Sequence, residues 1–185
     1  MAIALLIILL TPLLGAIVAL VGGGRLGART AWLALLPPLL ACTATLWLVA
    51  QFVPGTRTVI EWAWIPSLGL NLTFVIDGLA LFFGLVVSGM GVLVVFYSAH
   101  YLDHHYREHG RFYCYLMLFM GAMLGTVFAG NLLLLFVCWE LTGVASFLLI
   151  GFLHHKGESR DGARMALLVT GGTGLAMLAG IVLLG

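Results

Sequence analysis

One carboxylate lies in the middle of an apolar segment that is long enough to cross a membrane. The segment covers residues 131–153, and Glu140 lies near its centre. At about 1.5 Å per helical residue, a helix of this length spans a hydrocarbon core of about 30 Å. A central charged residue costs roughly 2.5–3.5 kcal/mol, whereas each Leu, Ile, Phe or Val returns about 0.3–0.6 kcal/mol. Because these four residue types make up most of the segment, we expect it to insert.

The depth of Glu140 indicates what chemistry it could perform. All other Asp and Glu residues, and all eight Lys and Arg residues, lie at or beyond the ends of apolar runs. An ionisable side chain at mid-membrane depth usually belongs to a proton or cation pathway, so we predict that Glu140 is a proton relay. The alternative is a neutral carboxyl group that forms a structural hydrogen bond to a neighbouring helix.

Three further side chains are secondary candidates for the pathway. Thr142 and Ser146 share a helical face offset from Glu140, where they can hold water, although such hydroxyls more commonly bond to the preceding turn. Asp77 lies in the first turn of a predicted span. There it can cap free N–H groups and interact favourably with the helix dipole, and we weigh this structural role above a role in an ion path.

Composition places the chain in a bilayer. Mean hydropathy is +1.18, 63% of residues are apolar and 8% are charged, which is typical of an integral membrane protein. A net charge of +1 with no clustered basic face argues against nucleic-acid binding. Cys42, Cys114 and Cys138 lie inside apolar runs and are interpreted as free thiols.

The sequence predicts neither a metal site nor a cofactor. His100 and His104 have a spacing that could hold zinc, but no Glu lies between them as a zinc-protease motif requires, and charged residues surround them. A haem would need histidines inside facing spans, whereas the histidines here lie at the ends of the apolar runs.

The elements that must position these residues are membrane helices. We predict an all-α integral membrane protein with about six transmembrane helices and a short extracytoplasmic β-hairpin between helices 2 and 3, turning at residues 66–69. Trp62 and Trp64 of the hairpin are interpreted as interfacial anchors. Pro37 and Pro38 should kink or break the second span, because proline removes backbone donors. The predicted spans are residues 2–21, 31–53, 77–101, 112–129, 131–153 and 163–185.

Residues 1–185 are expected to form a single membrane domain. No basic leader precedes the first apolar run, so we expect a retained helix rather than a cleaved signal peptide. The last span ends without a polar flank. This suggests that the chain is the N-terminal portion of a longer subunit.

Basic residues in the loops predict the orientation. Seven of them fall on one side of the membrane in the predicted topology and only Arg57 falls on the other. The positive-inside rule then makes the odd-numbered loops cytoplasmic and the N-terminus extracytoplasmic. The seven are Arg25, Arg29, Arg107, Arg111, Lys156, Arg160 and Arg164.

Several motifs along the chain resemble those of a known superfamily. The motif FVCWELT at residues 136–142, followed by SFLLIGF at 146–152, resembles the fifth helix of antiporter-like subunits. These subunits are shared by respiratory complex I and multisubunit cation/proton antiporters. The resemblance extends through residues 77–79, 110–125 and 162–171. Within the superfamily the chain is most similar to the N-terminal part of the A subunit of Mrp-type antiporters, because its sixth span carries Thr and Gly where complex I subunits typically carry an acidic residue.

The resemblance implies a role for one residue in particular. Glu140 corresponds to the family's fifth-helix glutamate, which pairs with a lysine on a broken seventh helix. The only lysine of this chain, Lys156, belongs to a loop. The resemblance therefore implies that other helices complete the ion path, and that the partners are other membrane subunits, the lipid bilayer, protons and Na+ (or K+ or Li+).

Three functions follow as hypotheses. The favoured one is a proton-translocating subunit, or the N-terminal part of one, that exports Na+ in exchange for H+ in the cell membrane. It would belong to a secondary transporter and would not be an enzyme. A second is the same architecture in a redox-driven proton pump of the complex I type, or in a bicarbonate-uptake or membrane-hydrogenase relative. A third, of another class, is a non-transporting helix bundle with a scaffold or assembly role.

Overall fold

The computed structural model describes residues 1–26, 30–65, 70–101 and 109–184. Six helices in these ranges are long and apolar enough to cross a membrane, and one two-stranded antiparallel sheet lies between the second and the third. The predicted fold class is therefore confirmed. The elements are α1 (Ala2–Leu26), α2 (Thr30–Ala34), α3 (Leu36–Gln51), β1 (Thr58–Ile65), β2 (Leu70–Ile76), α4 (Gly78–Tyr101), α5 (His109–Phe128), α6 (Leu132–Ile150), the 3₁₀ turn η3 (Gly151–Leu153) and α7 (Gly157–Leu184).

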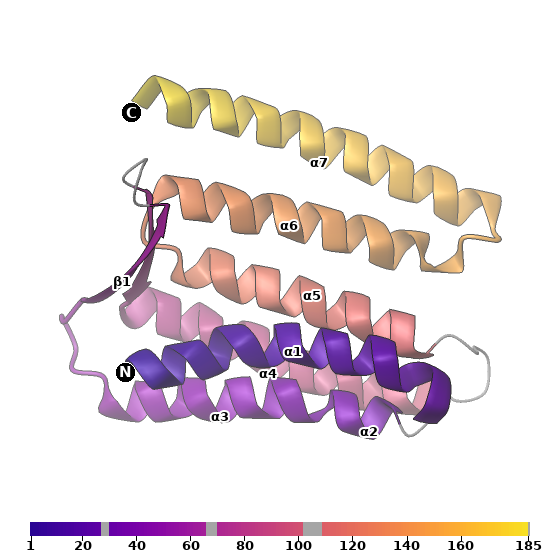
Figure 1. Cartoon of the computed structure of the whole chain (residues 1–185), viewed down its shortest axis with the longest axis horizontal. Helices are drawn as coiled ribbons and strands as arrows, with labels where there is room; N and C mark the ends of the chain where they lie inside the picture. Colours follow the sequence, from indigo (N-terminus) through magenta and orange to yellow (C-terminus); the bar gives the residue numbers. More distant parts are fainter. Residues whose placement is uncertain (27–29, 66–69, 102–108, 185) are drawn as a thin grey trace.

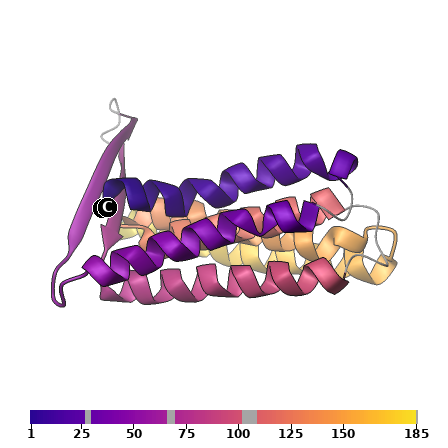
Figure 2. The same cartoon turned by 90° about the horizontal axis from the view of Figure 1, so that it is seen from below.

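The helices run side by side along one common direction (Figures 1 and 2). Helix α1 packs on α3 and α5, α4 packs on α3 and α5, and α6 lies between α5 and α7. The sheet lies across one end of the bundle, where the N-terminus and the end of α7 also lie. The opposite end holds the end of α1, the start of α5 and the connection from α6 to α7.

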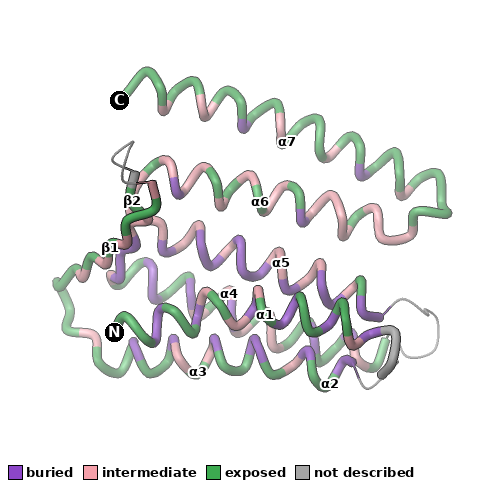
Figure 3. The backbone as a smooth tube through the Cα atoms, in the orientation of Figure 1, coloured by how far each residue is buried: buried purple, intermediate pink, exposed green. Residues whose placement is uncertain are grey.

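The compact part of the bundle consists of α1 to α5, because these helices carry most of the fully buried side chains. Tyr113, Met117, Leu124 and Phe128 of α5 are completely enclosed. Figure 3 shows the contrast with α7, along which most residues are exposed. Helices α6 and α7 therefore contact little of the chain beyond each other and α5.

Glycines set the distance between α1 and α5. A Cβ atom placed on Gly110 would lie 2.6 Å from the carbonyl oxygen of Ala19 and 2.8 Å from Cα of Gly23. Gly121 faces Leu13 of α1 in the same way, at 3.0 Å, while Gly125 on the same helix faces Cys138 of α6, at 2.7 Å. Small residues thus let α5 approach both neighbours closely, as membrane helices commonly do.

The second span is interrupted at the double proline, as predicted. Helix α2 ends at Ala34 and α3 begins at Leu36, so that Pro37 and Pro38 occupy the first turn of α3. Proline is tolerated there because its missing N–H would lack an intrahelical partner in any case. The backbone bonds from Leu35 to Ala31 and from Leu39 to Leu35 persist, so the span continues across the interruption.

Three helices extend further than hydropathy predicted. Helix α1 continues from the predicted end at 21 to Leu26, α5 begins at His109 instead of 112, and α7 begins at Gly157 instead of 163. Hydropathy detects the edge of the hydrocarbon layer, whereas the helical hydrogen bonds continue into the polar region. At α7 the acidic Glu158 lies in the first turn, where it interacts favourably with the helix dipole.

The hairpin forms a hydrogen bond to the connection between α5 and α6. In its register Thr58 pairs with Ile76 and Trp62 with Leu72, while the predicted turn at 66–69 lies outside the described residues. Gly130 donates its N–H to the carbonyl of Thr73 at 2.7 Å. The two tryptophans differ, because Trp62 packs edge-on against Phe74 at 5.6 Å between ring centroids whereas Trp64 is exposed. The interfacial role of both tryptophans stays a prediction.

Candidate functional site

Helix α6 places Glu140 near the middle of its span. The helix begins after Asn131, whose side-chain oxygen accepts the N–H of Leu134 at 2.7 Å. The amide of Asn131 also donates to the carbonyl of Asn71 on β2 at 2.9 Å. This cap joins the start of α6 to the hairpin, so the register of α6, and with it the height of Glu140, is tied to the compact part of the bundle.

The carboxyl group of Glu140 lies directly against the backbone of α7. A Cβ atom placed on Gly174 would overlap Oε1 of Glu140 and would lie 2.6 Å from its Cδ. Gly174 is buried, and Glu140 is half-buried. The carboxyl therefore occupies the space that a side chain at position 174 would take.

A cavity of about 130 Å³ opens beside this contact between α6 and α7. Four hydroxyl side chains line it together with Glu140, and the volume exceeds what a single water requires. The hydroxyls of Thr142 and Thr173 donate to backbone carbonyls of their own helices, at 2.6 and 2.8 Å, so their oxygens stay able to accept a hydrogen bond from water or a protonated carboxyl. The four hydroxyl residues are Thr142, Ser146, Thr170 and Thr173.

The structure thus brings together three of the four predicted site residues. Thr142 and Ser146 share one cavity with Glu140, and Thr142 also makes the bond to the preceding turn that is the commoner use of such hydroxyls. Sequence reasoning did not single out the contribution of α7. The signal was present, because Thr170, Thr173 and Gly174 have the i, i+3 and i, i+4 spacing of one helical face.

Within the described residues, no basic side chain forms an ion pair with Glu140. Lys156 is exposed in the connection between η3 and α7. The ion pair at the start of α7, between Arg164 and Asp161 at 3.8 Å, is exposed and lies away from the cavity lining. The family resemblance implies a lysine partner for Glu140. The described part of this chain does not supply it.

Asp77 lies apart from this site, at the hairpin end of the bundle. Its Oδ1 accepts the N–H of Ala80 at 2.8 Å, which is the bond of a helix N-cap. Asp77 also lines a polar cavity of about 220 Å³ that Arg57 shares. The structure shows the capping role; a role for Asp77 in an ion path stays a prediction.

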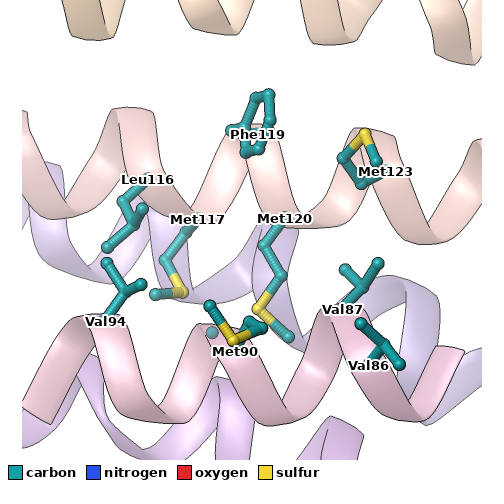
Figure 4. Close-up of a pocket in the computed structure, with 10 residues that line it drawn as sticks. Val86, Val87, Met90, Val94, Leu116, Met117, Phe119, Met120 and Met123 are labelled. Carbon is teal, nitrogen blue, oxygen red and sulfur yellow. The ribbon is translucent and has the colours of Figure 1, made fainter. Parts of the chain in front are cut away.

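The cavity between α4 and α5 differs in chemistry. Its volume is about 210 Å³ and its lining is apolar, with Met117 and Met120 of α5 pointing toward Met90 and Val94 of α4 (Figure 4). Among the described residues that line it, none carries a carboxylate, hydroxyl or basic group that could pass on a proton. This cavity therefore offers no relay.

The histidines do not form a metal site in the part of the chain that the structure describes. These ranges contain no group of three His, Cys, Asp or Glu side chains that could hold a metal ion. His104 of the histidine pair lies outside the described residues. Nδ1 of His100 lies 3.2 Å from the carbonyl oxygen of Phe96, within its own helix.

Two protein-family profiles match the chain. Residues 62–113 match the family described as NADH-Ubiquinone oxidoreductase (complex I), chain 5 N-terminus. Residues 129–184, which contain the whole cavity between α6 and α7, match the family described as NADH:quinone oxidoreductase/Mrp antiporter, TM.

Curated relatives are similar over most of this chain. The A/B subunit of a probable K(+)/H(+) antiporter of Rhizobium meliloti is 39% identical over 179 residues, which is 97% of this chain and 18% of the relative. The A subunit of the Na(+)/H(+) antiporter of Alkalihalophilus pseudofirmus is 42% identical over 158 residues, which is 84% of this chain and 19% of the relative. The chain thus spans about a fifth of the length of the curated relatives that it matches.

Two solved structures contain the same arrangement of helices. In the Mrp complex from Dietzia sp. DQ12-45-1b, the matching chain superposes with a TM-score of 0.81 at 30% identity, over 95% of this chain and 18% of that one. A chain of the membrane-bound sulfane sulfur reductase, an archaeal respiratory membrane complex, gives a TM-score of 0.79 at 18% identity, over 95% of this chain and 26% of that one. The second likeness concerns the fold alone.

Proposed function

Because this chain belongs to the superfamily of antiporter-like membrane subunits that complex I and Mrp antiporters share, we propose that it is part of a proton-translocating subunit of a multisubunit monovalent cation/proton antiporter. The proposed activity is the exchange of Na+ or K+ for H+, which is secondary transport and not enzymatic catalysis. Relatives named as subunits of Na(+)/H(+) and K(+)/H(+) antiporters support this class of ion.

One observation carries the proposal. A carboxyl group, Glu140, lies near the middle of a membrane span and beside a cavity lined by hydroxyls of two helices. A carboxylate at that depth can take up a proton, hold it and release it, provided that neighbouring oxygens or waters pass the proton on. The hydroxyls of Thr142, Ser146, Thr170 and Thr173 are placed to serve as such neighbours.

We further propose that residues 1–185 form one membrane domain, the N-terminal portion of a protein about five times as long. The 18–19% coverage of the curated relatives supports this. The remaining length and other membrane subunits would supply the basic partner of Glu140. The exposed face of α6 leaves room for them.

A second candidate is a proton-pumping subunit of a complex I type oxidoreductase. The match of residues 62–113 to the N-terminus of complex I chain 5 favours it. The two candidates share the relay at Glu140 and differ in the process to which proton movement is coupled, which is the export of a cation in one and electron transfer to quinone in the other.

Transport by the complete complex separates these candidates. Everted membrane vesicles from a host without its own cation/proton antiporters would be acidified by respiration and monitored with a pH-sensitive dye. We expect addition of Na+ or K+ to dissipate the pH gradient in vesicles that contain the complex. Vesicles from the host without the complex are the control. Proton uptake that requires a quinone-reducing reaction, with no response to either cation, would support the complex I type instead.

We also propose the orientation in the cell membrane. The C-terminal ends of α1, α4 and α6 lie at the end of the bundle opposite the hairpin. The three loops that carry most of the basic residues follow these helices, so they begin on the same side of the bundle. Arg29 and Arg107 themselves lie outside the described residues. The positive-inside rule places that side in the cytoplasm and the hairpin and N-terminus outside.

Cysteine labelling tests this orientation. A cysteine at exposed Glu61 of β1 should react with a membrane-impermeant thiol reagent applied to intact cells, whereas one at exposed Glu158 should react only after the membrane is opened. The parent chain serves as the control, because Cys42, Cys114 and Cys138 lie inside spans. The opposite labelling pattern would reverse the orientation.

A further inference from the structure

We propose that Gly174 is a positioning residue for the proton relay. Its missing side chain provides the space in which α7 holds the carboxyl group of Glu140 beside the cavity between α6 and α7. The inference rests on the proposed function of Glu140 and extends it to a residue of the neighbouring helix.

The contact between the two residues is unusually close. A Cβ atom at position 174 would overlap Oε1 of Glu140 and would lie 2.6 Å from Cδ and 3.1 Å from Oε2, so it would encounter all three atoms at the end of the side chain. Cβ atoms in proteins essentially never approach another heavy atom within 3.0 Å. Any residue other than glycine at position 174 must therefore displace the carboxyl group or separate α6 from α7.

Other glycines of α7 do not share this property. A Cβ atom on Gly172 or Gly180 would meet no atom within 4 Å, and one on Gly162 would only touch Ile150 at 3.9 Å. The close approach at Gly174 is thus tied to Glu140 and is not a general consequence of glycine in this helix. Because a Cβ atom on Gly172 or Gly180 meets no other atom, these two positions are suitable sites for control substitutions.

Displacement of the carboxyl group should impair proton transfer. The carboxyl lies against the backbone of α7 at Gly174, and Glu140 also lines the cavity, so a methyl group at position 174 moves the carboxyl from its place beside the cavity. Misplacement of a reacting group by about 1 Å can lower a rate about 100-fold, because proton transfer needs direct hydrogen-bond contact. We expect Gly174→Ala to lower coupled transport at least tenfold.

The first test uses the complete complex in everted vesicles. Gly174→Ala should lower cation-dependent pH recovery at least tenfold and shift its pH profile, at a normal level of assembled protein. Gly172→Ala and Gly180→Ala should stay within twofold of the parent. Normal transport and an unchanged pH profile in Gly174→Ala would overturn the inference.

A compensating substitution separates positioning from general helix packing. Glu140→Asp withdraws the carboxyl by one methylene, which makes room for a methyl group at position 174. If Gly174 positions the carboxyl, the double variant Glu140→Asp/Gly174→Ala should transport at least as well as Glu140→Asp alone, so that the two effects are strongly non-additive. Additive losses would show that Gly174→Ala acts by separating the helices, and would overturn the inference.

Chemical modification provides a readout that does not depend on transport. Glu140 in isolated membranes would be treated with a hydrophobic carbodiimide, which modifies membrane-buried carboxyl groups, and its modification would be followed by mass spectrometry. We expect Gly174→Ala to change the modification rate at least threefold and Gly172→Ala to leave it unchanged. Equal rates in the two variants would contradict the inference even if Gly174→Ala assembled poorly.

The relay hypothesis and the positioning inference can fail separately. Full transport by Glu140→Gln would remove the proposed function, whatever position 174 does. Loss of transport in Glu140→Gln together with normal transport in Gly174→Ala would leave the relay intact and remove only the positioning role.

Discussion

Replacement of Glu140 with Gln should lower coupled cation/proton exchange at least tenfold while the complex assembles normally. The amide has nearly the same shape as the carboxyl and can still lie against Gly174 and the hydroxyl-lined cavity, but it cannot take up and release a proton at working pH. Glu140→Asp keeps the titratable group and moves it away from α7. We therefore expect intermediate transport from the Asp variant.

The measurement must separate transport from assembly. Pull-down of the complex through one of its other components, quantified beside cation-dependent pH recovery in everted vesicles, gives both quantities for each variant. A structural carboxyl predicts another outcome, in which Gln is tolerated and any loss of transport follows loss of assembled complex. Full transport by Glu140→Gln at a normal protein level would exclude Glu140 from the proton path.

Replacement of Gly110 should strongly lower the stability of the bundle. A Cβ atom there would lie 2.6 Å from the carbonyl oxygen of Ala19 and 2.8 Å from Cα of Gly23, both of which are backbone atoms of α1. A side chain could rotate away, but a backbone cannot, so α1 and α5 would have to separate. Overpacking of this kind typically costs about 1–3 kcal/mol and occasionally more.

We expect Gly110→Leu to lower the melting midpoint of the detergent-solubilised protein by several degrees and to reduce the amount of folded protein in the membrane. Gly89→Leu of α4 is the matched control, because a Cβ atom there meets nothing within 4 Å. Fluorescence-detected size-exclusion chromatography after heating measures both variants. A normal melting midpoint for Gly110→Leu would show that the two helices are not in this contact.

Local sequence was enough to predict the membrane class, the six spans, the hairpin, the family and the position of Glu140 near the middle of its helix. These are properties of single segments, because insertion energy is summed along one stretch of about twenty residues. The break at Pro37 and Pro38 was predictable for the same reason, since proline acts on its own helix. The helix ends were less predictable. Helices α1, α5 and α7 continue into polar sequence, and hydropathy does not assign such sequence to a span.

Packing between helices, in contrast, determines which side chains share a site. The chain has 24 glycines, and helical spacing places Gly174 but not Gly172 on the face of Thr170 and Thr173. The spacing does not show that this face receives the carboxyl of Glu140, whereas a Cβ atom on Gly172 would meet no atom within 4 Å. The difference arises from the rotation of α7 about its own axis and from its distance to α6. In the same way Asp77 and Glu140 were both candidate acids by sequence, but they lie in separate cavities, because one precedes α4 and the other lies in the middle of α6. A site between two helices is a property of their interface, which the pattern of either helix alone does not specify.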